Sequence, residues 1–180
     1  DPIVFDCIEF NDRMRWSDVM SDVAFLVMDL QARKRPDLAS RFLNRYLEQT
    51  GDYAGVGVLR FYIVYRATVR AKVARLRAAQ TIDRTEKGAC IADYRDHIEL
   101  AIQATRYGRP AVIVTHGPTG SGKTTLSQAL VELGGAVRIR TDVERKRLHG
   151  LEPDARSGSG IQSGLYTPAE SRRTYLRVRA

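Results

Sequence analysis

The chain has 180 residues, which is enough for one large domain or two small ones. Its hydrophobic share of 43% is ordinary for a globular protein, and no apolar run approaches the roughly 20 residues of a membrane-spanning helix. The first residues, DPIVFD, lack the pattern of a signal peptide. We therefore expect a cytoplasmic protein without a membrane segment. A first residue other than Met suggests a processed chain or a piece of a longer one.

The net charge of +8 allows two interpretations. A basic surface attracts nucleic acid, but it also suits a protein that binds anionic nucleotides, and we favour the second. The two cysteines, Cys7 and Cys90, lie far apart and match no metal or redox spacing, so reduced thiols are the simplest interpretation. The three histidines are scattered and indicate no metal site.

Apolar residues recur at helical spacing through most of the first half of the chain. After a short strand at 4–10, the spacing predicts helices at about 16–30, 37–50, 56–79 and, starting near 85 or 90, up to 106. The first of these helices is apolar over much of its circumference, which indicates burial.

The helix predicted at 56–79 has an apolar face and a basic face. The apolar residues at steps of three and four are Tyr62, Tyr65, Val69, Val73 and Leu76. The basic face carries Arg66, Arg70 and Arg77. Such a face could hold phosphates, but charged residues normally occupy the side opposite an apolar stripe, so we interpret it as solvent-exposed surface.

Residues 107–110, with the sequence YGRP, interrupt the helical pattern, and we place a domain boundary there. The first domain would span 1–107 and would be nearly all helix. The second would span 108–180 and would combine strands with helices.

Residues 117–124 read GPTGSGKT, which is the phosphate-binding pattern G-x-x-x-x-G-K-[ST]. A short β-branched run precedes the pattern and a helical pattern follows it, which is the context that the motif requires. Glycines allow a tight turn and expose N–H groups that bind phosphate oxygens at the positive end of the helix. The motif therefore predicts an ATP site made of Gly117, Pro118, Thr119, Gly120, Ser121, Gly122, Lys123, Thr124 and Thr125. Lys123 would neutralise the outer phosphates, and the Thr124 hydroxyl would bind Mg²⁺.

The second half alternates strand and helix patterns. In chain order they predict a strand at 112–114, a helix at 123–134, a strand at 136–140, a helix from Thr141, a flexible loop at 152–164 and a helix from Pro168. The expected fold class is therefore mixed: a mainly α-helical N-terminal part, followed by the first half of an α/β P-loop nucleotide-binding fold with a parallel sheet. Two strands are fewer than the ~4–6 of a usual sheet, so we expect the chain to stop before its nucleotide domain is complete.

Asp142 comes directly after the second predicted strand. Ligands collect at the carboxyl ends of strands in open α/β sheets, so we expect Asp142 to face the phosphate site and Arg145 to clamp an anionic group. Asp142 could accept a proton from a substrate hydroxyl or hold a Mg²⁺-bound water. The alternative is that it only favours the dipole of the helix that it opens. A second acid for Mg²⁺ and an arginine-rich lid are not evident in the sequence.

These segments resemble a bacterial arrangement in which an aminoglycoside-phosphotransferase-like domain precedes an AAA-type P-loop kinase domain of the gluconate-kinase and zeta-toxin type. The second half carries the resemblance through GPTGSGKTT, RIRTDVERKRLHG and GLYTPAESRRTYLRV. The first half carries it through FDCIEFNDRMRWSDVMSDVAFLVMDL, RFLNRYLEQTGDY and FYIVYRATVRAKV. Together these stretches cover most of the chain.

The resemblance implies that the first half is the C-terminal-lobe remnant of a protein-kinase-like phosphotransferase fold. Asp6 would match the Mg²⁺-binding aspartate of that fold, and Asp22 the acid that opens the supporting helix. Without the resemblance, Asp6 reads as a turn acid at a strand end. The HGD-type catalytic loop and the nucleotide-binding N-lobe are absent from this sequence, so we expect the piece alone to be inactive.

The main functional hypothesis is an ATP-dependent kinase that transfers the γ-phosphoryl group to a hydroxyl of an unidentified small molecule. Lys123 and Asp142 would be catalytic, Asp142 and Arg145 would bind the acceptor, and Thr124 and Asp6 would hold Mg²⁺. Two alternatives stay open: a nucleotide-binding regulatory module without turnover, and a nucleic-acid-dependent ATPase. The lack of an aromatic-rich stacking surface argues against nucleic acid as a partner. The sequence gives neither the acceptor nor the oligomeric state.

Overall fold

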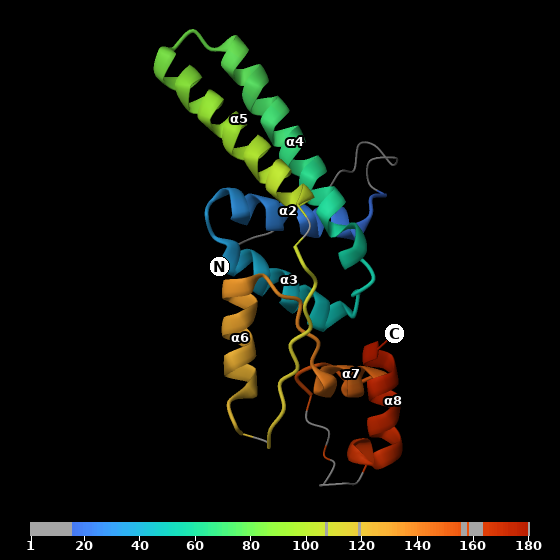
Figure 1. Cartoon of the computed structure of the whole chain (residues 1–180). Helices are drawn as coiled ribbons and strands as arrows, with labels where there is room; N and C mark the ends of the chain where they lie inside the picture. Colours follow the sequence, from blue (N-terminus) through green and yellow to red (C-terminus); the bar gives the residue numbers. More distant parts are fainter. Residues whose placement is uncertain (1–15, 107, 119, 156–157, 159–163, 180) are drawn as a thin grey trace. The chain divides into compact units, whose positions relative to one another are not determined.

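The structure is a computed structural model that describes residues 16–106, 108–118, 120–155, 158 and 164–179. These residues form two compact units. The first unit contains the helices α2, α4 and α5, and the second contains α3, α6, α7, a short 3₁₀ helix and α8 (Figure 1). The helix α3 therefore belongs with the later part of the chain, although it precedes α4 in the sequence.

The first unit is a long helical hairpin with a third helix against it. The hairpin consists of α4 (Val56–Gln80) and α5 (Arg84–Thr105), and α2 (Val19–Ala32) packs mainly on α4 (Figure 1). Asp83 caps the start of α5, because its side chain accepts hydrogen bonds from the N–H groups of Thr85 and Glu86. The three helices predicted in these parts of the chain are confirmed.

The buried face of α4 is an apolar stripe that consists of alanines from Ala67 onward. Its members recur at steps of three and four: Leu59, Ile63, Ala67, Ala71, Ala74 and Ala78. Alanine side chains at these positions let the backbones of neighbouring helices approach closely. The apolar face predicted for this helix is instead largely exposed, with Tyr65 and Leu76 each 52% accessible. The prediction was wrong because it ranked residues by the size of their apolar side chains, whereas most of the buried positions of this helix are alanines.

Two arginines of the predicted basic face of α4 contact α2. The Arg66 guanidinium donates to the Ser21 hydroxyl at 3.0 Å, and Arg70 donates to the Asp29 carboxylate at 3.4 Å. Both guanidinium groups also lie over the Phe25 ring, at 5.2 and 5.8 Å from its centre. This part of the basic face therefore binds a neighbouring helix and is not simply solvated surface.

The second unit contains α3 (Pro36–Thr50), α6 (Lys123–Gly134), α7 (Thr141–Leu148), the 3₁₀ helix Gly164–Tyr166 and α8 (Pro168–Arg179). Within it, α3 packs against α6 and α7 packs against α8. The helices predicted in these parts of the chain are confirmed.

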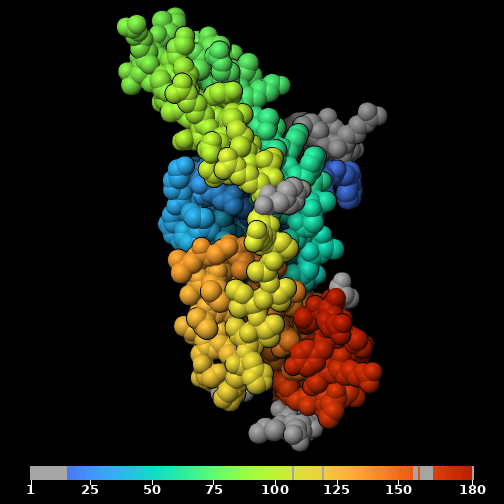
Figure 2. All heavy atoms as spheres, viewed as in Figure 1, coloured from blue at the N-terminus to red at the C-terminus, as the bar shows by residue number. Residues whose placement is uncertain are grey.

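The predicted parallel sheet is not present in the described residues, which are helical or irregular and include no strand. The α/β fold class is therefore corrected to an all-helical one for this part of the chain. The apolar side chains before the glycine loop have no covering layer, with Val112 91% and Val114 82% exposed. Figure 2 shows the chain from 108 to 118 at the surface. A strand requires a hydrogen-bonded neighbour, and that neighbour is not specified by the local pattern that predicted the strand.

The second predicted strand, 136–140, pairs with a side chain instead of a strand. The Asn44 side-chain amide donates to the Ala136 carbonyl at 2.9 Å and accepts from the Arg138 N–H at 2.7 Å. This pair of bonds satisfies backbone groups that would otherwise need a partner strand.

The strand predicted at 4–10 lies outside the described residues. Among the residues described, no helix combines the length and apolar character needed to cross a bilayer.

Enlarging an alanine of the buried stripe of α4 tests the helix packing. Ala67 is fully buried, so Ala67→Leu should overpack the hairpin and lower the free energy of unfolding by about 1–3 kcal/mol. Ala79→Leu, at an exposed position of the same helix, is the control and should change stability little. Urea denaturation monitored by circular dichroism measures both. Equal effects of the two substitutions would contradict the assignment of the buried face.

Candidate nucleotide-binding site

The glycine loop adopts a backbone conformation that depends on glycine. Gly120 has a φ angle of 82° and Gly122 one of 81°, both in the left-handed region that side-chain-bearing residues rarely adopt. Gly122 immediately precedes the first residue of α6. These glycines therefore turn the chain tightly into the helix, as the motif predicts. Thr119, a predicted member of the site, lies outside the described residues.

The start of α6 presents backbone N–H groups that have no cap. The first intrahelical bond runs from the Leu126 N–H to the Gly122 carbonyl, at 3.0 Å. The N–H groups of Lys123, Thr124 and Thr125 come before that bond, and no side chain caps the helix. The helix dipole adds partial positive charge at the same place. A phosphate is a suitable acceptor for this group of donors.

The side chain of Lys123 folds back on the loop. Its ammonium donates to the carbonyl oxygens of Gly117 at 2.7 Å and Pro118 at 2.5 Å, and lies 3.3 Å from the Ser121 hydroxyl. These acceptors are neutral, so a phosphate oxygen would compete for the ammonium through a stronger, charge-assisted bond. The charge of Lys123 is thus held at the loop that it is predicted to serve.

Thr124 is the predicted magnesium ligand that lies within the described residues. Thr124 is exposed in the first turn of α6 and offers a hydroxyl oxygen. Among the residues that the structure describes, no cluster of three or more His, Cys, Asp or Glu side chains could hold a metal ion. Mg²⁺ commonly keeps several waters and binds through substrate phosphates and one or two carboxylates, so the Thr124 hydroxyl alone would be only part of such a site. Asp6, the other predicted metal ligand, lies outside the described residues.

Asp142 lies in the first turn of α7 and has both carboxylate oxygens paired. It accepts a hydrogen bond from the Tyr166 hydroxyl at 3.0 Å and pairs with the Lys146 ammonium at 2.9 Å. Partial burial of Asp142 raises the pKa of its carboxyl, but the hydrogen bonds from Lys146 and Tyr166 outweigh burial and place the pKa below its ordinary value. Asp142 is therefore ionised at neutral pH.

Arg145 contacts Tyr166, the same aromatic residue that donates a hydrogen bond to Asp142. Its guanidinium carbon is 4.8 Å from the centre of the Tyr166 ring, which is a cation–π geometry. Its Nε is buried and has no hydrogen-bond partner in the described structure. A buried donor without a partner is costly, so this Nε is an energetically unfavourable feature of the α7 surface.

The structure thus brings Asp142 and Arg145 together and adds Lys146 and Tyr166 to them. Lys146 could have been found from its i, i+4 spacing to Asp142. Tyr166 could not, because it follows a glycine-rich loop and no local pattern relates it to α7. Hydrogen bonds or ion pairs between this cluster and the glycine loop are not seen among the described residues.

A buried glutamate joins α7 to α8. The Glu144 side chain is 3% exposed and pairs with Arg147 and, at 2.8 Å, with Arg177 of α8. A buried carboxylate such as that of Glu144 requires cationic partners, since an unpaired buried charge is strongly destabilising. This cluster therefore fixes the helix that carries Asp142 and Arg145 against α8.

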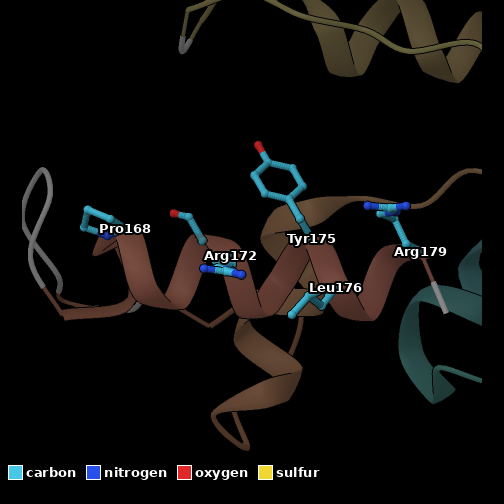
Figure 3. A pocket seen from close by; sticks show the side chains of 6 residues that line it. Pro168, Arg172, Tyr175, Leu176 and Arg179 are labelled. Carbon is cyan, nitrogen blue, oxygen red and sulfur yellow. The ribbon is translucent and has the colours of Figure 1, made fainter.

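The outer face of α8 carries a shallow hollow of about 480 Å³. It is lined by side chains of that helix alone: Pro168, Ser171, Arg172, Tyr175, Leu176 and Arg179 (Figure 3). The residues predicted to bind nucleotide or acceptor do not line it. The hollow is therefore a separate surface feature.

A comparison with protein families assigns part of the second half. Residues 112–180 match the model of an AAA domain family, AAA_33. The matched residues include the glycine loop, Asp142 and Arg145. This family indicates a P-loop nucleotide-binding domain, and it includes kinases. The comparison gives no support to the aminoglycoside-phosphotransferase-like assignment of the first half.

The chain also has relatives among curated proteins. It is 38% identical over 169 residues to the Uncharacterized protein Rv2004c of Mycobacterium tuberculosis and to the Uncharacterized protein Mb2027c of Mycobacterium bovis. Each alignment covers 94% of this chain and 33% of the relative, so the chain spans about a third of the length of these proteins. A search of solved structures found no significant match.

Removal of one hydrogen bond tests the environment of Asp142. Tyr166→Phe deletes a donor that favours the ionised carboxylate, so the pKa of Asp142 should rise. Carboxyl ¹³C chemical shifts, followed from acid to neutral pH, measure it. Tyr175→Phe, at an exposed position of α8, should leave the pKa unchanged. An unchanged pKa in Tyr166→Phe would contradict the contact.

The lowered pKa of Asp142 also predicts how the free energy of unfolding changes with pH. The folded-state pKa of Asp142 lies below its ordinary value of 3.8, so the ionised carboxylate stabilises the fold above that pH. This contribution is lost as the pH falls through the folded-state pKa. Between neutral pH and about pH 4, Tyr166→Phe should therefore be less stable than the wild type. The difference should shrink at lower pH, and a difference that grows there would contradict the sign.

Proposed function

We propose that residues 112–180 bind ATP with Mg²⁺ and act in a kinase that transfers the γ-phosphoryl group to a small-molecule hydroxyl. The observation that carries the proposal is the glycine-dependent turn that exposes uncapped N–H groups at the start of α6 beside the Lys123 ammonium. The AAA_33 match supports it at the level of the family.

In this proposal the loop binds and neutralises the nucleotide. Backbone N–H groups from Gly120 to Thr125 would surround the phosphates, and Lys123 would exchange its carbonyl partners for phosphate oxygens. Thr124 would be the protein ligand of Mg²⁺, and the ion would offset charge on the transferring group. Whether Asp6 contributes to a metal site stays a prediction.

Asp142 and Arg145 would bind the acceptor. The low pKa of Asp142 keeps its carboxylate ionised, so it can accept a hydrogen bond from a hydroxyl and orient it. An incoming hydroxyl would have to compete with Tyr166 or Lys146 for a carboxylate oxygen. Arg145, whose guanidinium lies over the Tyr166 ring beside Asp142, would bind an acidic or phosphate group of the acceptor.

The longer protein is proposed to be a two-domain phosphotransferase, with 1–107 as part of a phosphotransferase-like domain and 108–180 as part of the P-loop kinase domain. The sequence resemblance supports this division, and relatives about three times as long leave room for the rest of both domains. The cytoplasm is its proposed location.

A regulatory module that binds nucleotide without turnover is the second candidate. The pairing of both Asp142 oxygens favours it, because a carboxylate that is already bonded is less available to a substrate. A nucleic-acid-dependent ATPase has weaker support, since Arg66 and Arg70 of α4 are engaged with α2.

Loss of the loop ammonium tests nucleotide binding. Lys123→Ala should weaken Mg·ATP binding at least about tenfold, or ~1.4 kcal/mol, because it removes the charge that faces the outer phosphates. Isothermal titration calorimetry measures the affinity. Lys72→Ala, at an exposed position of α4, is the matched control and should bind as the wild type does. Equal affinities in the two variants would contradict the proposed site.

Asp142→Asn separates the two candidate functions. The amide keeps the shape of the side chain but cannot accept a proton. If the protein is a kinase, this variant should bind Mg·ATP within a few-fold of the wild type and lose phosphoryl transfer by at least about a hundredfold. A screen of hydroxyl compounds with γ-³²P-ATP, on a protein of the relatives' length, measures transfer. ATP binding without transfer in the unsubstituted protein would favour the regulatory module.

A further inference from the structure

The helix α3 is bonded to three separate parts of the second unit. It contacts α6, the extended stretch 136–140 and α7, and each contact uses polar side chains. The sequence of α3 contributes to the resemblance of the first half, but the nucleotide hypothesis assigns this helix no role. Its contacts nevertheless lie on both sides of Asp142 in the sequence. One is with the stretch 136–140 before it, and one is with the later part of α7.

The contact with α6 is an arginine–carboxylate pair. The Arg41 guanidinium donates two hydrogen bonds to one Glu132 oxygen, at 2.8 and 2.9 Å. Gln128, one turn earlier in α6, donates to the same oxygen at 2.7 Å. This links α3 to the C-terminal half of the helix that begins at the glycine loop.

The contact with the extended stretch is made by two buried side chains. Asn44, 3% exposed, bonds the Ala136 carbonyl and the Arg138 N–H, and so holds both backbone groups in register. Glu48, also 3% exposed, accepts from the Arg138 guanidinium at 2.9 Å and lies 3.6 Å from that of Arg140. The stretch held in this way leads directly into Asp142.

The contact with α7 lies on the other side of Asp142. Arg147 donates from Nη2 to the Glu48 carbonyl at 2.6 Å, at the C-terminal end of α3 where carbonyl groups lack helical partners. Gly51 ends α3 with a φ angle of 76°, and a Cβ atom there would lie 2.8 Å from Arg147 Nε. The glycine thus leaves the space through which the guanidinium reaches the helix end.

We propose that α3 is the element that fixes Asp142 relative to α6, with Asn44 and Glu48 as positioning residues. They hold the chain before Asp142, Arg147 holds it after, and Arg41 ties the same helix to α6. The importance of this for phosphoryl transfer rests on the proposed function. The positioning of α7 is independent of the proposed function, because the bonds that produce it lie within the protein.

Amide exchange in the 180-residue chain tests the first step. In the wild type, the bond to Asn44 should protect the Arg138 N–H from exchange. Asn44→Ala should speed exchange of that amide at least about tenfold, while amides within α6 keep their rates. Gln49→Ala, at an exposed position of α3, should leave all these rates unchanged. An Arg138 rate that is equal in Asn44→Ala and the wild type would overturn the proposal.

A distance measurement tests the positioning itself. Spin labels would be placed on cysteines substituted at Leu133 of α6 and at Glu152 just after α7, both exposed, with Cys7 and Cys90 replaced by serine. The wild-type background and Gln49→Ala should give a narrow distance distribution, and Asn44→Ala a broad one. A loss of stability alone would not broaden the distribution of the folded molecules.

Gly51→Ala provides a second perturbation that does not touch Asn44. A methyl group there would displace Arg147 from the end of α3, so the distance distribution should broaden while the Arg138 amide stays protected. Distributions as narrow as the wild type in both variants would overturn the positioning role. If the wild type fails to bind Mg·ATP but the variants behave as expected, the proposed function falls and the role of α3 stands.

Discussion

The second unit depends on a set of backbone N–H groups that the fold leaves without internal partners. Left-handed glycines turn the chain into α6, and the helix start then presents amides that no side chain caps. Unpaired donors of this kind carry a cost unless a ligand or water accepts from them. A phosphate satisfies several of them at once, and the nearby Lys123 ammonium adds the opposite charge. The expected chemistry follows from this local electrostatic constraint.

The need to satisfy buried polar groups also explains why α3 belongs to the second unit. The stretch 136–140 has backbone groups that would pair in a sheet, and Asn44 satisfies two of them with one amide side chain. Glu48 compensates two arginines of that stretch. A helix that comes before the α4–α5 hairpin in the sequence thus contributes to the unit that holds the glycine loop. The division of the chain into domains near residue 107 remains a prediction.

Local signals gave the helices and the glycine loop, because spacing and turn residues act over a few positions. The sheet could not be predicted from them: the run Val112–Val114 has the composition of a strand, but its pairing partner is not a local property. Asn44 and Tyr166 were missed for the same reason, since each acts on a residue distant in the sequence. For α4 the pattern was present but misread, because the buried face from Ala67 to Ala78 is formed by alanines, which the search for large apolar residues passed over.

The most direct test of the nucleotide site is a titration of the ¹⁵N-labelled chain with Mg·ATP, followed by two-dimensional NMR. The account predicts saturable shifts of the amide signals of Gly120, Gly122, Lys123 and Thr124, the groups that the turn leaves exposed. Amide signals of the glycine loop that stay unchanged at saturating Mg·ATP would contradict it.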